Sequence, residues 1–285
     1  MKDRKFLWAS CIVCLSGLVV FFVVPFAISF FAAFFEISAD GAKFTFGNFA
    51  KVFGSGSFLL ALKNTLAFTG VIVLFINAMA YSAALLLKNT LKNQRLVYLL
   101  TLPMFVPVVS ITPVFADIFA HENLLTKIIS LVTGETNYGM LKLDYGYVLI
   151  IVIFLWKYTG LHIFIYLSGM MKIPKYIYDA ARMDGAGAFA VQRKIVFPLM
   201  LPYVCVSIVL VIVNSFKIFK EIYVIYGNYP PSNIYFLQHY IQNQFLKLNY
   251  ELTAAASYIF LLMLYGLVAA LVVYINRHLG EFADE

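Results

Sequence analysis

Six long apolar stretches alternate with shorter polar segments along this chain, at about 8–35, 58–87, 96–120, 147–171, 203–226 and 254–275. A helix needs roughly 20 apolar residues to cross about 30 Å of hydrocarbon, and each stretch is long enough. The strands of a membrane barrel would instead alternate in polarity over about ten residues. The pattern therefore predicts an all-α integral membrane protein, with six transmembrane helices in one transmembrane domain over residues 1–285.

Basic side chains gather in alternate connecting segments. Because short cytoplasmic loops carry the excess of Lys and Arg, this asymmetry predicts that both termini and the segment 172–202 are cytoplasmic. Twelve basic residues lie on that side and six on the other. The twelve are Lys2, Arg4, Lys5, Lys88, Lys92, Arg95, Lys172, Lys175, Arg182, Arg193, Lys194 and Arg277, and the six are Lys43, Lys51, Lys63, Lys127, Lys142 and Lys247.

The composition excludes a soluble protein. Hydrophobic residues make up 62% of the chain and charged residues 12%, a balance typical of membrane proteins. The net charge of +7 mostly reflects the asymmetry of the loops. The chain has no room for the separate basic domain that nucleic-acid binding requires, so we expect the lipid bilayer, and no nucleic acid, as its surroundings.

Several segments carry more specific predictions. The first stretch is too long for a signal peptide and is expected to remain as a helix. Three prolines in the third stretch predict kinks and a place inside the bundle: Pro103, Pro107 and Pro113. Of the external segments, 36–58 is expected to be a surface loop and 121–138 a short interfacial helix ending at Gly134. The segment 227–250 is either an aromatic interfacial belt or a functional element, namely a lid or a docking surface for a partner.

The polar segment 172–202 interrupts a sequence otherwise suited to lipid. Pro174 suits the first turn of a helix over 176–183, and residues 184–187 supply a bend where β-carbons would be resisted. A second helix over 188–196 then runs back to Pro198 and Pro202, which mark the beginning of the fifth span. A solvated loop would not need the apolar residues found here, Ile177, Met183, Phe189 and Ile195, so we interpret the segment as a helix-turn-helix that meets another surface.

Residues suited to catalysis or metal binding are scattered. Cys11 and Cys14 share one helix face inside hydrocarbon, where packing is the simpler role, and the same holds for Cys205. The histidines lack Asp, Glu or Cys partners at ligand spacing, and His162 is expected to be a hydrogen-bonded core residue. No G-x-x-x-x-G-K-[ST] phosphate loop occurs, so no ATP chemistry is expected in this chain.

The bend of segment 172–202 carries a family resemblance. Its spacing resembles the EAA loop of ATP-binding-cassette importer permeases, through Asp179-Ala180-Ala181, Asp184-Gly185-Ala186, Ile195 and Pro198. Ile173-Pro174-Lys175 also fits. The chain departs from the pattern in having Asp179 where Glu is usual and Gln192 where an aromatic residue is common.

The likeness extends over most of the chain. Residues 215–230 and 249–264 resemble segments of the carbohydrate-uptake branch, and residues 121–125 resemble its short external helix. Tyr226-Gly227-Asn228-Tyr229 departs from the threonine and paired glycines usual before the proline. The short charged tail lacks the Gly-rich ending of the second permease of such pairs, so the chain is similar to the first, of the maltose or glycerol-phosphate type.

The resemblance implies a type I importer permease fold in a bacterial or archaeal plasma membrane, and a division of labour. An extracytoplasmic solute-binding protein would deliver a sugar, a second permease would complete the path, and two cytoplasmic ATPases would bind ATP and Mg and drive alternating access. This chain would then be no enzyme. Its coupling residues would be Tyr178, Asp179, Ala180, Ala181, Asp184, Gly185, Ala186, Ile195 and Pro198.

Polar and charged residues inside the spans are the candidates for substrate contacts, because burying such a side chain without a partner or water is costly. Aligned through the loop, six positions resemble the cavity lining of the family: Lys157, Tyr158, Leu161, Asn214, Ser215 and Ile218. Lys220 and Glu221 suit a structural ion pair or an interfacial anchor. Lys157, Lys217 and Lys220 permit an acidic cargo, such as a uronate-containing oligosaccharide or a sugar phosphate, whereas a carboxylate of a partner chain would neutralise Lys157 equally well.

The rival class is an ion-coupled secondary transporter of a small polar solute. Such proteins normally show internal repeats with interrupted helices in matching positions, and no repeat is evident here. Neither that class nor a membrane enzyme explains the cytoplasmic helix-turn-helix.

Overall fold

A computed structural model of the chain describes residues 2–38, 41–88, 99–118 and 146–283. Most of these residues are helical. The chain forms two compact units, the first comprising Met1–Leu59 and Tyr240–Met263, the second Leu60–His239 and Leu264–Glu285. The short external helix expected over 121–138 lies outside the described residues.

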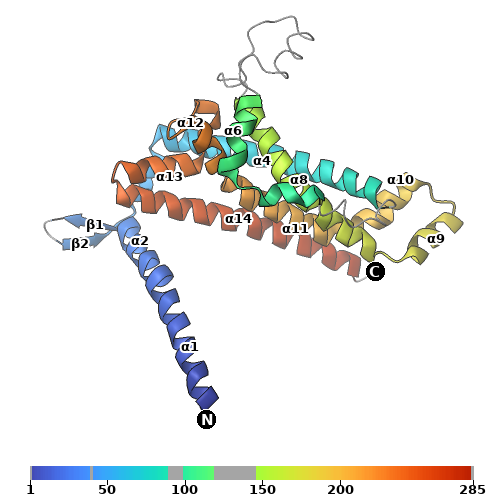
Figure 1. Cartoon of the computed structure of the whole chain (residues 1–285), viewed down its shortest axis with the longest axis horizontal. Coiled ribbons are helices and arrows are strands. Elements are labelled where there is room, and N and C mark those ends of the chain that lie inside the picture. Colours follow the sequence, from blue (N-terminus) through green and yellow to red (C-terminus); the bar gives the residue numbers. More distant parts are fainter. Residues whose placement is uncertain (1, 39–40, 89–98, 119–145, 284–285) are drawn as a thin grey trace, which may run out of the picture. The chain divides into compact units, whose positions relative to one another are not determined.

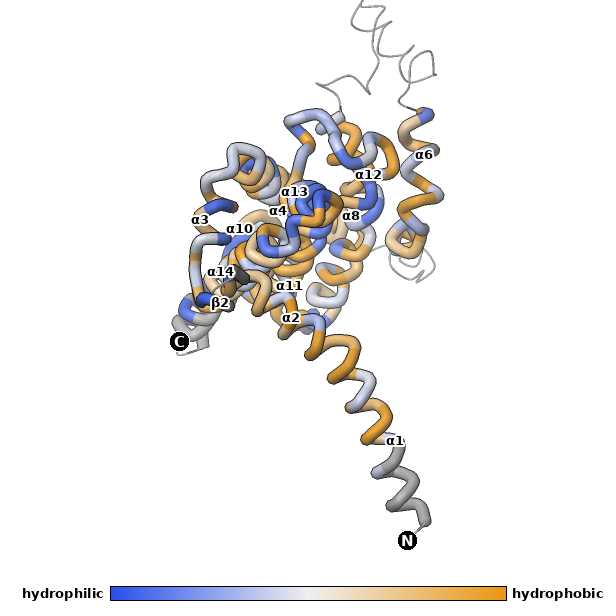
Figure 2. The backbone as a smooth tube through the Cα atoms, turned by 90° about the vertical axis from the view of Figure 1, so that its left-hand side faces the viewer, coloured by the Kyte–Doolittle hydropathy of each residue, from blue (hydrophilic) through white to orange (hydrophobic). Residues whose placement is uncertain are grey.

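The first unit begins with a helix of the expected length. Helix α1 (Lys2–Leu18) continues through a π-helical turn, η1 (Val19–Val23), into α2 (Val24–Phe34), which has Pro25 in its first turn (Figure 1). Residues Ser10–Phe34 are long and apolar enough to cross a membrane. The tube along this helix is predominantly in the colours of hydrophobic residues (Figure 2), as expected for a helix that lipid surrounds.

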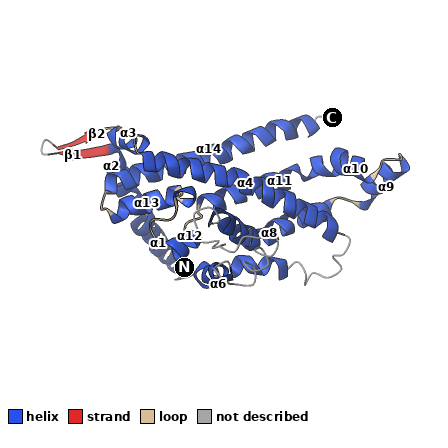
Figure 3. Ribbon diagram, turned by 90° about the horizontal axis from the view of Figure 1, so that it is seen from above, coloured by secondary structure: helices blue, strands red, loops and turns tan. Residues whose placement is uncertain are grey.

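The external segment 36–58 contains regular structure, so the prediction of a plain surface loop was wrong. Strands β1 (Phe35–Ser38) and β2 (Gly41–Phe44) form an antiparallel hairpin with Phe35 opposite Phe44 (Figure 3). The Asp40-Gly41 pair in the sequence is a hairpin signal. Helix α3 (Gly47–Phe53) follows.

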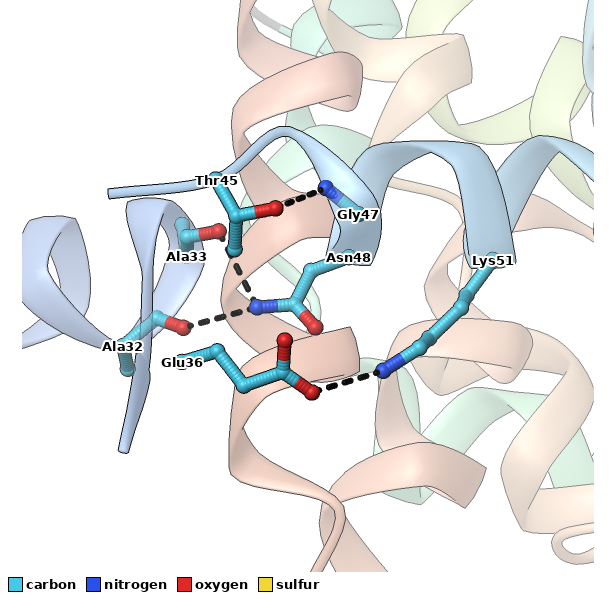
Figure 4. Close-up of polar contacts among 7 residues, drawn as sticks. All are labelled: Ala32, Ala33, Glu36, Thr45, Gly47, Asn48 and Lys51. Atoms are coloured by element: carbon cyan, nitrogen blue, oxygen red, sulfur yellow. Dashed lines mark hydrogen bonds and ion pairs between the residues drawn. The ribbon is translucent and has the colours of Figure 1, made fainter. Parts of the chain in front are cut away.

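Helix α3 caps the end of α2 (Figure 4). The buried Asn48 amide donates to the carbonyl oxygens of Ala32 and Ala33, at 3.4 and 3.2 Å. The last carbonyls of a helix have no partner within it, so these bonds satisfy groups that would otherwise be orphaned. Exposed Lys51 and Glu36 pair at 3.5 Å, a contact of small energetic weight.

The second unit contains most of the membrane-spanning helices. Its first elements are α4 (Gly56–Leu87, which begins in the first unit), η2 (Leu102–Phe105), α6 (Val108–Ile118) and α8 (Gly146–Lys172). Then come α9 (Lys175–Met183), α10 (Ala188–Val191), the π-helical η3 (Gln192–Val196), α11 (Phe197–Phe216), α12 (Lys220–Tyr226) and η4 (Ser232–Ile234). Helices α13 (Leu237–Leu246) and α14 (Tyr250–Ala283) run through both units.

The described residues confirm five of the six predicted apolar spans. Five helices are long and apolar enough to cross a membrane, and a sixth candidate is a pair, Leu99–Phe105 and Val108–Ile118, bent by 105°. The bend falls beside Pro107, as the prolines predict. Within the described residues, Thr112 is the buried residue of α6, and Phe105 of η2 and Val109 of α6 are exposed. Helix α6 packs against α8 and α12, and the place of this segment inside the bundle stays a prediction.

The core of the second unit lies between α4, α8 and α11. Buried side chains from all three helices meet there, with others from the chain around α12 and η4: Phe68, Ile72, Ile76, Leu149, Ile150, Ile153, Phe154, Val211, Ile218, Ile222, Ile234 and Phe236. Gly160 lets the chain at Leu100 approach α8, because a β-carbon there would lie 1.7 Å from the Leu100 carbonyl oxygen.

The segment 227–250 contributes to the core as well as to the surface. Phe236 and Tyr240 are 1% exposed, so a purely interfacial aromatic belt was the wrong prediction for them. Phe236 packs on Phe68 of α4, with 5.2 Å between ring centroids. Tyr240 packs in turn on Phe58, with 5.3 Å between ring centroids, so aromatic packing within the chain accounts for the difference.

Candidate functional site

The bend predicted within 172–202 is present, and its geometry follows from the residues at 184–187. Helix α9 ends at Met183 and is followed by the cap residue Asp184, and Gly185 adopts φ +75°, where a β-carbon is strained. The Gly185 and Ala186 amides donate to the carbonyls of Arg182 and Ala181, both at 3.0 Å. This pair of bonds is a Schellman motif, which satisfies the last carbonyls of α9 and turns the chain back.

The turn carries an exposed apolar tip. Helices α9 and α10 project beyond the ends of α8 and α11 in two perpendicular views (Figures 1 and 3). Met183, just before the bend, is 88% exposed, and Phe189, just after it, is 78% exposed. Exposing such side chains to water is unfavourable, so a surface that covers them would gain by their burial.

The predicted coupling residues divide between the surface of the turn and its base. Asp179, Ala180, Asp184 and Gly185 are exposed, whereas Ala181 is buried. Tyr178, Ala186, Ile195 and Pro198 are half-buried and tie the turn to the bundle. Asp179 and Arg182 lie one turn apart, with 4.0 Å between Asp179 Oδ1 and Arg182 Nη1, and both are largely exposed.

A second hydrophobic cluster fixes the base of the turn. Ala181, Val191 and Val196 from the loop join residues of α4, α8 and α11: Ala80, Ala84, Ile163, Tyr166, Leu167, Met170 and Met200. Gln192, in a position where an aromatic side chain is common in the family it resembles, donates a hydrogen bond to the Tyr81 hydroxyl of α4. Gln192 therefore joins this position to α4 by a polar contact.

The prolines predict a second short helix that is separate from the fifth span, but in the structure α10 continues into that span. Ala188–Tyr226 reads as one apolar span, in which η3 connects α10 to α11. Pro198 lies in the first turn of α11, and Pro202 lies inside that helix. A π-helical turn inserts an extra residue, which helps a helix to continue past a position that lacks a backbone donor. The tip is thus joined directly to a membrane-spanning helix.

The predicted substrate positions lie in the second unit, and one of them belongs to a buried ion pair. Lys157 of α8 pairs with Glu221 of α12 at 2.9 Å, with side chains 11% and 7% exposed. Glu221 thus takes Lys157, and not its neighbour Lys220, as its ion-pair partner. The carboxylate that neutralises Lys157 therefore belongs to this chain, whereas the sequence had also allowed a carboxylate of a partner chain.

The other predicted positions lie on α8, on α11 and just after α11. Tyr158 packs against the core cluster that contains Ile218, and Leu161 and Asn214 are half-buried. Ser215 is fully buried, and its hydroxyl lies 2.8 Å from that of Thr69. Tyr158 thus packs against the cluster to which Ile218 belongs, and Ser215 lies at the contact with α4.

A polar network lies inside the spans. Of its members, only His162 was predicted from the sequence. Asn77 Oδ1 accepts from the hydroxyls of Tyr166 and Ser207, at 2.5 and 2.7 Å. The Ser207 proton is used in that bond, so the buried His162 donates from Nδ1 to Ser207 Oγ at 2.7 Å. This confirms His162 as a hydrogen-bonded core residue and joins α4, α8 and α11. The signal in the sequence was Asn77, a lone amide in an apolar stretch.

The described part of the chain contains no group of three or more His, Cys, Asp or Glu side chains that could hold a metal ion. Its cysteines are free: Cys11, Cys14 and Cys205.

Comparisons with known proteins place these features in context. The family described as "Binding-protein-dependent transport system inner membrane component" matches residues 76–281. The arabinooligosaccharides transport system permease protein AraP of Bacillus subtilis is 27% identical over 260 residues, covering 89% of this chain and 82% of that protein. The lactose transport system permease protein LacF of Rhizobium radiobacter is 25% identical over 229 residues, with 76% of each chain covered.

A solved structure shows the same fold. A chain in the crystal structure of a bacterial ABC transporter involved in the import of the acidic polysaccharide alginate is similar with a TM-score of 0.79. The two chains are 21% identical, and the match covers 97% of this chain and 96% of that one.

Proposed function

This chain belongs to the family of binding-protein-dependent transport system inner membrane components, and from that premise we propose how its parts work. It is a multi-pass permease subunit of an importer, not an enzyme. We propose that it forms the path for a sugar together with a second permease. Two cytoplasmic ATPases would bind ATP and Mg, and an extracytoplasmic binding protein would deliver the cargo.

The α9–α10 turn is the proposed contact with one ATPase. The supporting observation is its exposed apolar tip. The tip lies at a bend that Gly185 forms with a positive φ, and α10 after the bend is continuous with α11. A rigid connection of this kind would transmit closure of the ATPases to the membrane helices as a tilt. The coupling residues named above would form the contact surface and its base.

An oligosaccharide is the proposed cargo. AraP is a permease for arabinooligosaccharides and LacF for lactose, and each aligns with at least 76% of this chain. We propose a neutral sugar, because Lys157 is already neutralised by Glu221. Selectivity within this chain would then rest on hydrogen bonds from residues such as Tyr158 and Asn214.

The test is to co-purify this chain with its partner subunits after placing a charge on the tip, as Met183→Glu or Phe189→Glu. The control is Tyr229→Glu, which alters a side chain 70% exposed in the loop predicted on the opposite side of the membrane. We expect the tip variants to lose the ATPase subunit and its stimulated ATP hydrolysis, and the control to retain both. Unchanged ATPase recovery in both tip variants would contradict the proposal.

A further inference from the structure

A cleft of about 690 Å³ lies behind the α9–α10 turn. Its walls come from the turn and from the last residues of two spans, Leu85 of α4 and Met170 and Met171 of α8. Both helices end within two residues of these positions. The cleft therefore opens where the hydrocarbon meets water, a depth at which lipid headgroups lie.

The cleft has an excess of positive charge. Lys88, Lys175 and Arg182 line it, against one carboxylate, that of Asp179. Asp179 is 69% exposed and 4.0 Å from Arg182, so it compensates that cation weakly. The ammonium of Lys88 lies 3.6 Å from the centroid of the Tyr178 ring, which holds this cation beside the cleft through the face of the ring.

An unsatisfied hydroxyl accompanies these cations. Tyr178 lines the cleft, and its hydroxyl is buried with no hydrogen-bond partner in the described part of the chain. A buried hydroxyl without a partner is unfavourable, and an acceptor oxygen on a ligand would satisfy it.

We propose that the cleft binds an anionic phospholipid. The phosphate would lie against Lys88, Lys175 and Arg182, and an acyl chain would follow the apolar wall at Leu85 and Met170. Basic pockets between the ends of membrane helices bind anionic headgroups in this way. A zwitterionic lipid would leave the excess charge uncompensated, and a small soluble anion would leave the apolar wall bare.

The bound lipid would stabilise the turn on the membrane side, opposite the exposed tip. Tyr178 and Ala186 belong to the turn and also line the cleft. Lipid composition would then set how firmly the turn is held, without any change in the tip itself. This inference does not depend on the identity of the protein that covers the tip.

The experiment is native mass spectrometry of the assembled complex, titrated with phosphatidylglycerol or phosphatidylcholine. The test variants are Lys88→Gln, Lys175→Gln and Arg182→Gln. The matched control is the pair Arg193→Gln and Lys194→Gln, which removes two exposed cations of the same segment that do not line the cleft. Retained assembly of each variant shows that it is folded.

We expect saturable binding of phosphatidylglycerol that weakens about fivefold for each cleft cation removed, with little change in the control. Equal affinity for the two lipids, or equal weakening in the control, would overturn the proposal. Competition by glycerol 3-phosphate at the same concentration would show a site for soluble anions instead. Lipid binding to this chain purified without the ATPase subunits, but not to the assembled complex, would assign the cleft to the ATPase.

Discussion

Two charged residues inside the spans are held as a pair, and their separation has a definite cost. Lys157 and Glu221 lie 2.9 Å apart with little solvent access. Replacing Glu221 by Gln leaves a buried cation without a counter-charge, which costs about 3–5 kcal/mol in such pairs. We expect Glu221→Gln to lower the thermal unfolding midpoint of the purified protein markedly, as measured by circular dichroism.

The double variant Lys157→Met with Glu221→Leu is the control for this pair. It removes both charges while keeping similar volumes, and such exchanges are often neutral or stabilising. We expect it to recover most of the stability that Glu221→Gln loses. If the double variant were less stable than Glu221→Gln, the ion pair would stabilise the fold by more than the mutual neutralisation of its charges.

His239, outside the spans on α13, makes stability depend on pH. Burial lowers its pKa from the usual 6.5 to about 4. Its Nδ1 accepts a hydrogen bond from the Phe236 amide at 3.4 Å, which requires the neutral ring. The unfolded chain takes up a proton below pH 6.5 and the folded chain only near pH 4. The contribution of His239 to the free energy of unfolding is therefore fully present above pH 6.5. It is lost as the pH falls from 6.5 to about 4, by about 3 kcal/mol at most.

The measurement is the unfolding midpoint of the native chain and of His239→Gln between pH 7 and pH 4. We expect the variant to be less stable at pH 7 because it loses a well-packed ring, but to show a smaller drop toward pH 4. Parallel curves for the two proteins would assign the acid sensitivity to other groups.

Among the elements, the α9–α10 bend depends on one residue. Gly185 has φ +75°, and a β-carbon there would meet no atom within 4 Å, so a side chain is opposed by backbone strain alone. A β-branched residue adds about 1–2 kcal/mol of strain at such a position. We expect Gly185→Val to reduce stimulated ATP hydrolysis in the assembled complex by disturbing the bend, while the membrane helices stay folded.

Gly187 offers the matched control for the bend. It is two residues further on, has an ordinary φ of −68°, and is equally open. Gly187→Ala is expected to leave hydrolysis unchanged. Equal losses in Gly185→Val and Gly187→Ala would show that the turn tolerates no side chain for reasons other than backbone conformation.

Elements differ in how well the sequence predicts them, for physical reasons. The spans and the bend were predictable because hydrocarbon demands continuous apolar runs and because Asp184-Gly185-Ala186 suits a left-handed turn. The hairpin at Phe35–Phe44 was missed since its strands are only four residues long. The Lys157–Glu221 pair joins residues 64 positions apart, and such long-range partners are not encoded by any local pattern.

At the scale of the whole molecule, the interior of the second unit bears on the charge of the cargo. The hypothesis of an acidic sugar rests on three lysines, and for one of them, Lys157, Glu221 already compensates the charge. The unpaired cations of this region are Lys217 and Lys220, which are exposed and hold no ion pair with another described residue. They lie just after the 20 residues of α11, about one membrane thickness from its beginning. A cation at that depth can stay in water without a bound anion.

Cargo charge can be tested by competition for uptake in cells or proteoliposomes that contain the complete transporter. We expect neutral oligosaccharides to compete at least as well as uronate-containing oligosaccharides of the same length. We also expect the double variant Lys217→Gln with Lys220→Gln to leave competition by both kinds of oligosaccharide unchanged, because these cations need no charge on the cargo to remain solvated. Competition by uronates alone, reduced in that double variant, would instead identify the two lysines as the contacts that select an acidic sugar.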